Sequence, residues 1–202
     1  MQRVNWGIIG LGKMALKFAE SFKDIKNAQL VSISSKDINR LQTFKEKFKI
    51  DNDLSFENYE ELIQCQKVDI VYIALPNSHH YNWIIKCIEQ KKRILVEKPA
   101  LVSMDEAVKI NNKLLGKDLL FVEAFMYRFH PQIKKIIELI KKNKIGKLIS
   151  IESKFGKDIM TKKNFFKFKI NKKINKKNRL FNKKLGGGSI LDLGCYPVSF
   201  SL

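Results

Sequence analysis

Short apolar runs alternate with segments in which apolar positions recur every three or four residues, from residue 4 to residue 125. The runs are typical of buried strands, and the longer spacing indicates helices with one buried face. The predicted strands cover residues 4–9, 29–34, 68–75, 93–97 and 119–125. The predicted helices cover residues 13–22, 38–48, 59–63, 81–89 and 104–115. This alternation predicts an α/β fold with a doubly wound parallel sheet.

The pattern changes after Arg128. Residues 131–142 predict a helix with isoleucines on one face, ended by Gly146, and residues 148–156 alternate loosely like a strand with one covered face. We therefore expect a second domain of α+β type, with the boundary between residues 123 and 124. The two predicted domains are 1–123 and 124–202.

Composition adds a strong positive charge. The 202 residues carry a formal net charge of +19, and the excess is densest in the segment 157–184. A nucleic-acid partner is one interpretation, because phenylalanines interleave with the lysines there. The interpretation that we favour is a bias towards Lys, Asn and Ile along the whole chain, with 157–184 as an exposed, mobile loop.

Other composition features narrow the class of protein. No window of eighteen apolar residues predicts a transmembrane helix, and the segment 1–10 does not resemble a signal peptide. The three cysteines are scattered and odd in number, which favours reduced thiols and a cytoplasmic protein. They lack metal-ligand spacing, and we predict no metal site.

A glycine pattern follows the first predicted strand. Gly10, Gly12 and Ala15 form a G-x-G-x-x-A pattern at the start of the first helix. Gly10 allows a tight turn, Gly12 lets a pyrophosphate approach the backbone, and Ala15 lets the helix pack closely. An ordinary tight turn is the alternative. We predict a dinucleotide site whose loop also includes Leu11, Lys13 and Met14.

The end of the second strand bears on the cofactor. An NAD-binding domain usually offers a carboxylate there to the ribose hydroxyls. This chain has Ser35 and Lys36, and the carboxylate of Asp37 comes only after them. A hydroxyl beside a cation suits a 2′-phosphate, so NADP is favoured over NAD. The alternative is that Lys36 is one more solvated lysine.

Several motifs together resemble a known family. Pro76-Asn77 and His80 follow the third strand, and Glu97-Lys98-Pro99 ends the fourth. EAFMYRFHP at 123–131 and LGGGSILDLGCYP at 185–197 come later in the chain. In this order they resemble the Gfo/Idh/MocA oxidoreductases. Within that family they resemble the branch of dimeric dihydrodiol dehydrogenases, NADP-dependent D-xylose dehydrogenases and glucose–fructose oxidoreductase.

The resemblance implies an N-terminal Rossmann domain and a C-terminal domain with an open antiparallel sheet, often in homo-oligomers. It implies hydride transfer between a nicotinamide and the hydroxyl carbon of a sugar or diol substrate. Lys98 would lie by the reacting hydroxyl. Tyr196 stands where most of the family has histidine and this branch has tyrosine.

The acid–base chemistry of alcohol oxidation also suits Lys98 and Tyr196. Removing hydride from an alcohol carbon requires loss of the hydroxyl proton. A phenol has a pKa of about 10 in water, and a neighbouring ammonium lowers such a pKa by favouring phenolate. We therefore predict Tyr196 and Lys98 as the catalytic pair. A buried aromatic ring with a satisfied hydroxyl is the alternative for Tyr196.

The remaining predicted residues are secondary. Asn77 and His80 would line the nicotinamide side or cap the following helix. Arg128 would contact substrate or form an interdomain ion pair. Asp192 would contact substrate or cap a helix near Gly194. The cofactor set also includes Leu75, Pro76, Glu97 and Lys98, and the substrate set is Lys98, Arg128, Asp192 and Tyr196.

Relatives of this kind continue well beyond the tyrosine segment, so we expect the chain to be C-terminally truncated. Its second domain would lack most of the open sheet, and its substrate pocket would be incomplete. Three hypotheses follow: an NAD(P)-dependent sugar or diol dehydrogenase, an inactive dinucleotide-binding remnant, and a basic nucleic-acid-binding protein. The first is favoured, with no membrane partner and nucleic acid as the least favoured partner.

Overall fold

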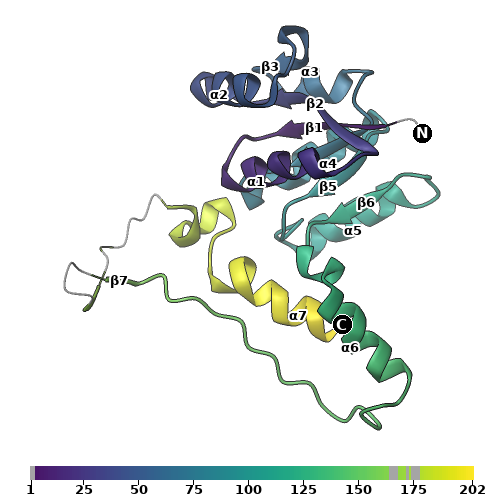
Figure 1. The fold of residues 1–202 in the computed structure, drawn as a ribbon, viewed down its shortest axis with the longest axis vertical. Helices are drawn as coiled ribbons and strands as arrows, with labels where there is room; N and C mark the ends of the chain where they lie inside the picture. The colour runs from purple at the N-terminus through teal and green to yellow at the C-terminus, as the bar shows by residue number, and fades with distance from the viewer. Residues whose placement is uncertain (1–2, 164–167, 172, 174–177) are drawn as a thin grey trace. The chain divides into compact units, whose positions relative to one another are not determined.

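A computed structural model describes residues 3–163, 168–171, 173 and 178–202. The chain divides into two compact units, Met1–Ala124 and Phe125–Leu202 (Figure 1).

The first unit is built on one parallel sheet. Its six strands lie in the order β3-β2-β1-β4-β5-β6, and every neighbouring pair is parallel. The strands are β1 Val4–Ile9, β2 Ala28–Ser34, β3 Ser55–Phe56, β4 Ile70–Ile73, β5 Arg93–Val96 and β6 Phe121–Glu123. The order reverses between β1 and β4, which makes the sheet doubly wound and Rossmann-like, as predicted.

Helices cover both faces of this sheet and create two apolar cores. The helices are α1 Lys13–Ser21, α2 Ile38–Phe48, α3 Tyr59–Gln64, α4 His80–Glu89 and α5 Met104–Leu114. Residues of α1 and α2 pack on Ile8, Ile33 and Tyr72. Residues of α3, α4 and α5 pack on the opposite face, around Ile9 and Val71. Successive strand residues thus enter opposite cores, as the strand period requires.

Helix ends agree with local sequence signals. The Ser103 hydroxyl accepts a hydrogen bond from the Glu106 amide (3.2 Å), as in a capping box. The Glu106 carboxylate reaches one residue further back than usual and accepts from the Val102 amide (3.0 Å). Asp37 and Asn58 cap α2 and α3 through their side-chain oxygens.

The second unit is less regular. Its helices are α6 Pro131–Lys141 and α7 Cys195–Ser201, and a π-helical turn, Ile190–Gly194, leads into α7. Its strands β7 Thr161–Lys163 and β8 Lys169–Asn171 form a two-stranded antiparallel sheet. A short 3-10 turn at Met126–Phe129 precedes α6.

One expectation for this unit was wrong, because residues 148–156 form no strand. Among the described residues, the antiparallel sheet of this unit consists of the β7–β8 pair. A strand needs a hydrogen-bonded neighbour, and the described part of the second unit offers none to this segment. Ile149 accordingly keeps 92% of its surface exposed.

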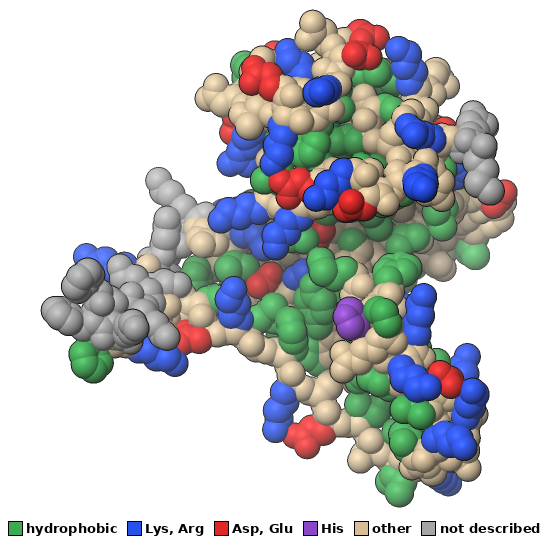
Figure 2. Space-filling model, in the orientation of Figure 1, with side chains coloured by type: hydrophobic (Ala, Val, Ile, Leu, Met, Phe, Trp, Pro, Cys, Tyr) green, Lys and Arg blue, Asp and Glu red, His purple; other side chains and the backbone are tan. Residues whose placement is uncertain are grey.

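The basic segment 157–184 was expected to be an exposed loop. Its described part contains the β7–β8 pair and two 3-10 turns, Arg179–Phe181 and Lys183–Leu185. Residues 164–167, 172 and 174–177 lie outside the described residues, so Phe165 and Phe166 are not placed. On the face drawn in Figure 2, the described Lys and Arg side chains are spread widely and stand among Asp and Glu.

The glycine segment makes a tight bend. A Cβ atom on Gly187 would lie 2.2 Å from the Arg179 carbonyl oxygen and 2.8 Å from that of Asn182. Only glycine fits at position 187, because the chain folds back on the carbonyl groups of residues 179–182 at this point. Across the described ranges of the chain, no helix has the length and apolarity needed to cross a membrane.

Candidate dinucleotide site

The predicted cofactor residues of the first unit follow four neighbouring strands. They lie in the segments after β1, β2, β4 and β5. Because all four strands are parallel, these segments meet at the carboxyl edge of the sheet. The β1–β4 reversal occurs in their middle, which is where open α/β sheets bind ligands.

The two glycines after β1 have different surroundings. Gly10 has φ +85°, and a Cβ there would lie 2.6 Å from Leu75 Cδ2 and 2.8 Å from the Ala74 carbonyl oxygen. Gly12 has φ −88°, and a Cβ there would meet nothing within 4 Å. The fold therefore requires glycine at position 10, whereas position 12 leaves open space next to the backbone. That space fits the close approach of a pyrophosphate.

Helix α1 begins at this open space. Gly12 is its N-cap and provides no side-chain acceptor, and its first turn contains no acidic residue. Its first amide groups therefore point out of the helix, with the positive end of the helix dipole behind them. Leu11 and Ala15 are buried, while Lys13 and Met14 are exposed. A bound phosphate would thus meet backbone amides at this point.

The segment after β2 offers a hydroxyl and cations. Ser35 is 4% exposed, and its hydroxyl accepts from the Asp37 amide (3.0 Å). Lys36 is exposed, with its ammonium 5.8 Å from the centre of the Tyr59 ring. Asp37 caps α2 and forms an ion pair with Arg40 (3.1 Å). The nearest carboxylate is therefore already engaged, which favours the 2′-phosphate interpretation.

The segment after β4 is held by a histidine. His80 is fully buried, and its Nδ1 and Nε2 lie 2.9 Å and 2.8 Å from the carbonyl oxygens of Pro99 and Leu75. Burial lowers the pKa of His80, and the carbonyl contacts partly oppose that shift. The His80 side chain thus lies between two loops and contacts both, and its role beside the cofactor stays a prediction. Asn77 is also buried, at 5% exposure.

The segment after β5 carries Lys98. Glu97 and Lys98 are half-buried, and the peptide bond between Lys98 and Pro99 is cis. The Tyr72 hydroxyl donates a hydrogen bond to the Glu97 carboxylate. The Glu123 carboxylate accepts from the Ala100 amide (2.8 Å). Side chains of β4 and β6 therefore fix this loop on both flanks.

The predicted catalytic tyrosine lies in the second unit, within an aromatic cluster. The Tyr196 ring centre is 4.9 Å from that of Phe155, 5.4 Å from that of Phe125 and 6.0 Å from that of Tyr127. Lys98 belongs to the first unit and Tyr196 to the second. Their pairing accordingly stays a prediction.

Arg128 and Asp192 have partners within the second unit. The Arg128 guanidinium donates to the Ser199 hydroxyl (2.9 Å), which also accepts from the Tyr127 hydroxyl (2.8 Å). Asp192 lies 3.7 Å from the Arg179 guanidinium, inside the π-helical turn. It does not cap a helix at Gly194, because the helical backbone already begins at Ile190. Their predicted contacts with substrate remain predictions.

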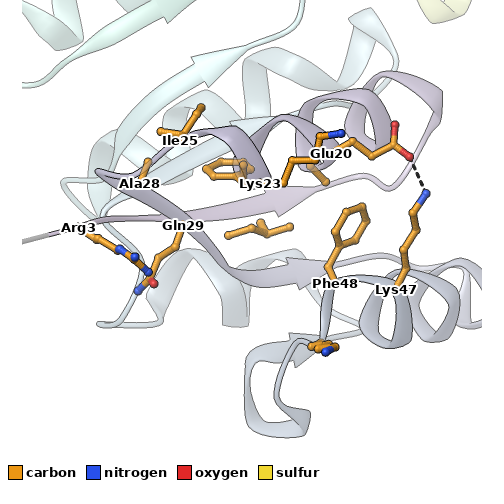
Figure 3. A pocket seen from close by; sticks show the side chains of 12 residues that line it. Arg3, Glu20, Lys23, Ile25, Ala28, Gln29, Lys47 and Phe48 are labelled. Atoms are coloured by element: carbon orange, nitrogen blue, oxygen red, sulfur yellow. Dashed lines mark hydrogen bonds and ion pairs between the residues drawn. The ribbon is translucent and has the colours of Figure 1, made fainter.

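A separate hollow of about 800 Å³ lies at the opposite edge of the sheet. Figure 3 shows Phe48 beside it and the Glu20–Lys47 ion pair at its side. The last turns of α1 and α2 contribute to this hollow. Helix C-termini present carbonyl groups, which disfavour phosphate, and this hollow lies away from the carboxyl edge at which open α/β sheets bind ligands.

Three residues of the site were missed by sequence reasoning. Arg40 stands three residues after the N-cap Asp37, the i,i+3 spacing of an ion pair, and that spacing could have pointed to it. Tyr72 and Glu123 lie inside apolar strand segments. A polar group in such a run requires a buried partner, and that signal could have found both.

Comparison with known proteins agrees with this architecture. Residues 4–124 match the model of the Gfo/Idh/MocA family, described as an oxidoreductase family with an NAD-binding Rossmann fold. The match covers more than half of the chain, and it spans the doubly wound sheet and the four segments at its carboxyl edge. The chain belongs to this family of oxidoreductases.

Named relatives come from the branch that the sequence motifs resemble. The chain is 27% identical to trans-1,2-dihydrobenzene-1,2-diol dehydrogenase of Xenopus tropicalis, over 96% of this chain and 54% of the relative. It is 28% identical to D-xylose 1-dehydrogenase (NADP(+)) 2 of Haloferax volcanii, over 96% of this chain and 55% of the relative. The chain thus spans about half the length of these curated relatives.

A solved structure of a related enzyme has a similar fold. A variant of the 3-ketoreductase KijD10 from Actinomadura kijaniata, in complex with TDP-benzene and NADP, superposes with a TM-score of 0.64 at 26% identity. The superposition covers 72% of this chain and 46% of that protein.

Proposed function

We propose that this chain binds NADP(H) and contributes to hydride transfer between the nicotinamide and a hydroxyl-bearing carbon of a sugar or vicinal diol. The observation that carries the proposal is the open backbone at Gly12, at the uncapped start of α1. The names of the dihydrodiol and xylose dehydrogenases support the substrate class. The NADP bound in the structurally similar ketoreductase supports the choice of cofactor.

The protein groups have separate proposed roles. The amides of α1 and the Gly12 backbone hold the pyrophosphate, and Ser35, Lys36 and Arg40 hold the 2′-phosphate. When bound, the nicotinamide supplies the hydride acceptor or donor. In the oxidising direction Tyr196 takes up the hydroxyl proton while the C–H electron pair leaves with the hydride. The Lys98 ammonium stabilises the phenolate that accepts this proton.

The first experiment is a titration of the 202-residue chain with NADPH, followed by nicotinamide fluorescence, with NADH in parallel. We expect saturable binding that is tighter for NADPH. Equal affinities for the two cofactors would contradict the 2′-phosphate roles. Absence of binding to both would contradict the proposal as a whole.

Turnover separates an enzyme from a binding remnant. Sugars such as D-xylose and trans-dihydrodiols are offered with NADP, and NADPH formation is followed. The Lys98→Met variant should bind NADPH as the unaltered chain does and lose any turnover. Full turnover by Lys98→Met would contradict the catalytic assignment, and binding without turnover in the unaltered chain would favour the remnant.

A further inference from the structure

Tyr72 is a polar side chain in an apolar core. It lies in β4 with 2% of its surface exposed, and its ring packs 4.3 Å from that of Phe18, centre to centre. A buried hydroxyl is costly unless it makes a hydrogen bond. Its partner is the carboxylate of Glu97, the residue before Lys98.

The bond runs from the middle of the sheet to its carboxyl edge. Tyr72 of β4 pairs with Leu95 of β5, so Glu97 lies two residues beyond the strand partner of Tyr72. The phenol therefore reaches diagonally under the loop. Burial, and then the neighbouring carboxylate, raise the pKa of Tyr72. The hydroxyl thus keeps its proton and remains a donor at neutral pH.

The rest of the loop is held by other groups. His80 contacts the Pro99 carbonyl, and Glu123 accepts from the Ala100 amide. Loss of the Tyr72 hydroxyl would consequently leave the backbone of the loop in place. It would release mainly the Glu97 carboxylate.

The position of Glu97 at the end of β5 indicates which half of a bound dinucleotide it lies near. The pyrophosphate lies after β1 in such sheets, and the adenosine ribose lies after β2. Strand β5 lies on the other side of β1, beyond β4. We propose that Tyr72 is a positioning residue that orients the Glu97 carboxylate towards the nicotinamide half of the bound dinucleotide. This inference rests on the proposed function.

The test compares a whole cofactor with its adenosine half. Affinity for NADPH is measured by fluorescence, and affinity for adenosine 2′,5′-bisphosphate by calorimetry. Tyr72→Phe keeps the ring against Phe18 and removes only the hydroxyl. The matched control is Ser32→Ala, which also removes one buried hydroxyl, hydrogen-bonded to the Leu54 carbonyl (2.8 Å).

Tyr72→Phe should weaken NADPH binding by about fivefold to tenfold, as expected for one hydrogen bond to a charged group. It should leave the bisphosphate affinity within about twofold, and Ser32→Ala should change neither affinity. In a Glu97→Ala background, Tyr72→Phe should have no further effect on NADPH, because its action passes through that carboxylate.

Three results for Tyr72→Phe would overturn the inference. They are an equal loss of affinity for both ligands, an unchanged NADPH affinity, and a loss of NADPH affinity that adds to that of Glu97→Ala. Failure of the unaltered chain to bind either ligand would overturn the proposed function, and the inference with it. The two kinds of failure are therefore distinguishable.

Discussion

Gly10 and Gly12 stand two residues apart in one loop, but only Gly10 is enclosed by the chain's own atoms. Leu75 and Ala74 surround it, and its positive φ adds a second requirement for glycine. Gly12 has neither constraint. Gly10 is therefore required by the fold, whereas Gly12 leaves room for a ligand that approaches the backbone from outside.

Substitution at Gly10 should lower stability. Gly10→Ala combines a disfavoured backbone conformation with two contacts shorter than 3 Å. We expect the free energy of unfolding to fall by about 2 kcal/mol or more. Urea unfolding followed by tryptophan fluorescence measures it, with Gly12→Ala as the matched control. A similar loss in both variants would contradict the distinction between the two glycines.

Substitution at Gly12 should separate stability from binding. Aspartate is a better N-cap than glycine, so Gly12→Asp should keep stability or raise it by a few tenths of a kcal/mol. The same carboxylate would repel a pyrophosphate at the start of α1. We therefore expect loss of measurable NADPH binding in a well-folded variant. Retained NADPH affinity would contradict a phosphate site at this helix.

Charge reversal at Lys36 should alter cofactor preference. Lys36→Glu replaces an attraction for the 2′-phosphate by a repulsion, and we expect NADPH affinity to fall by about tenfold or more. NADH lacks that phosphate and should change by less than about threefold. Lys23→Glu makes the same charge change at the opposite edge of the sheet and is the control. Parallel losses for both cofactors in Lys36→Glu would rule out a specific phosphate contact.

Burial of His80 should make stability sensitive to acid. Its folded-state pKa lies below the ordinary value of 6.5. Between these two values the unfolded chain binds more protons than the folded chain, so the free energy of unfolding falls as pH falls below 6.5. The loss is at most about 1.4 kcal/mol per pH unit.

Thermal unfolding between neutral and mildly acidic pH measures this dependence. His80→Gln keeps an amide donor but cannot titrate, so the curve for this variant should be flatter. The exposed neighbour provides the control, since His79→Gln should retain the slope of the unaltered chain. Identical slopes for the His80 variant and the unaltered chain would exclude His80 as the source.

Lys92 should be structural in spite of its charge. It is 8% exposed, and its ammonium donates to the carbonyl oxygens of Cys65 (2.7 Å) and Val68 (2.6 Å). Lys92→Met leaves both acceptors without this donor and should cost about 3 kcal/mol of stability. Lys91→Met, at the exposed neighbour, should cost less than about 0.5 kcal/mol. Chemical denaturation of both variants checks the difference.

The first unit could be predicted closely because its signals are local. Strands and helices follow from apolar spacing, and most predicted bounds lie within two residues of those observed. The glycine pattern also depends only on backbone conformation and position. The Tyr72–Glu97 bond could not be read in this way, because its residues lie 25 positions apart and meet only through strand order.

The second unit was predicted less well for a physical reason. Helix α6 was expected from its isoleucine spacing, since a helix satisfies its own backbone hydrogen bonds. Residues 148–156 also have a strand-like alternation, but a strand depends on a partner that a local pattern cannot supply. The contacts of Arg128 and Asp192 likewise could not be predicted, because their partners Ser199 and Arg179 lie 71 and 13 positions away in the sequence.

The reversal of strand order between β1 and β4 has a consequence for folding kinetics. Trp6 of β1 pairs with Ile70 of β4, so this central pairing must close a long loop before it gains its hydrogen bonds. The glycine loop and the Asn77 loop follow these two strands and meet only once they pair. The dinucleotide site is therefore assembled late, and we expect cofactor binding to be recovered in the slowest phase of refolding.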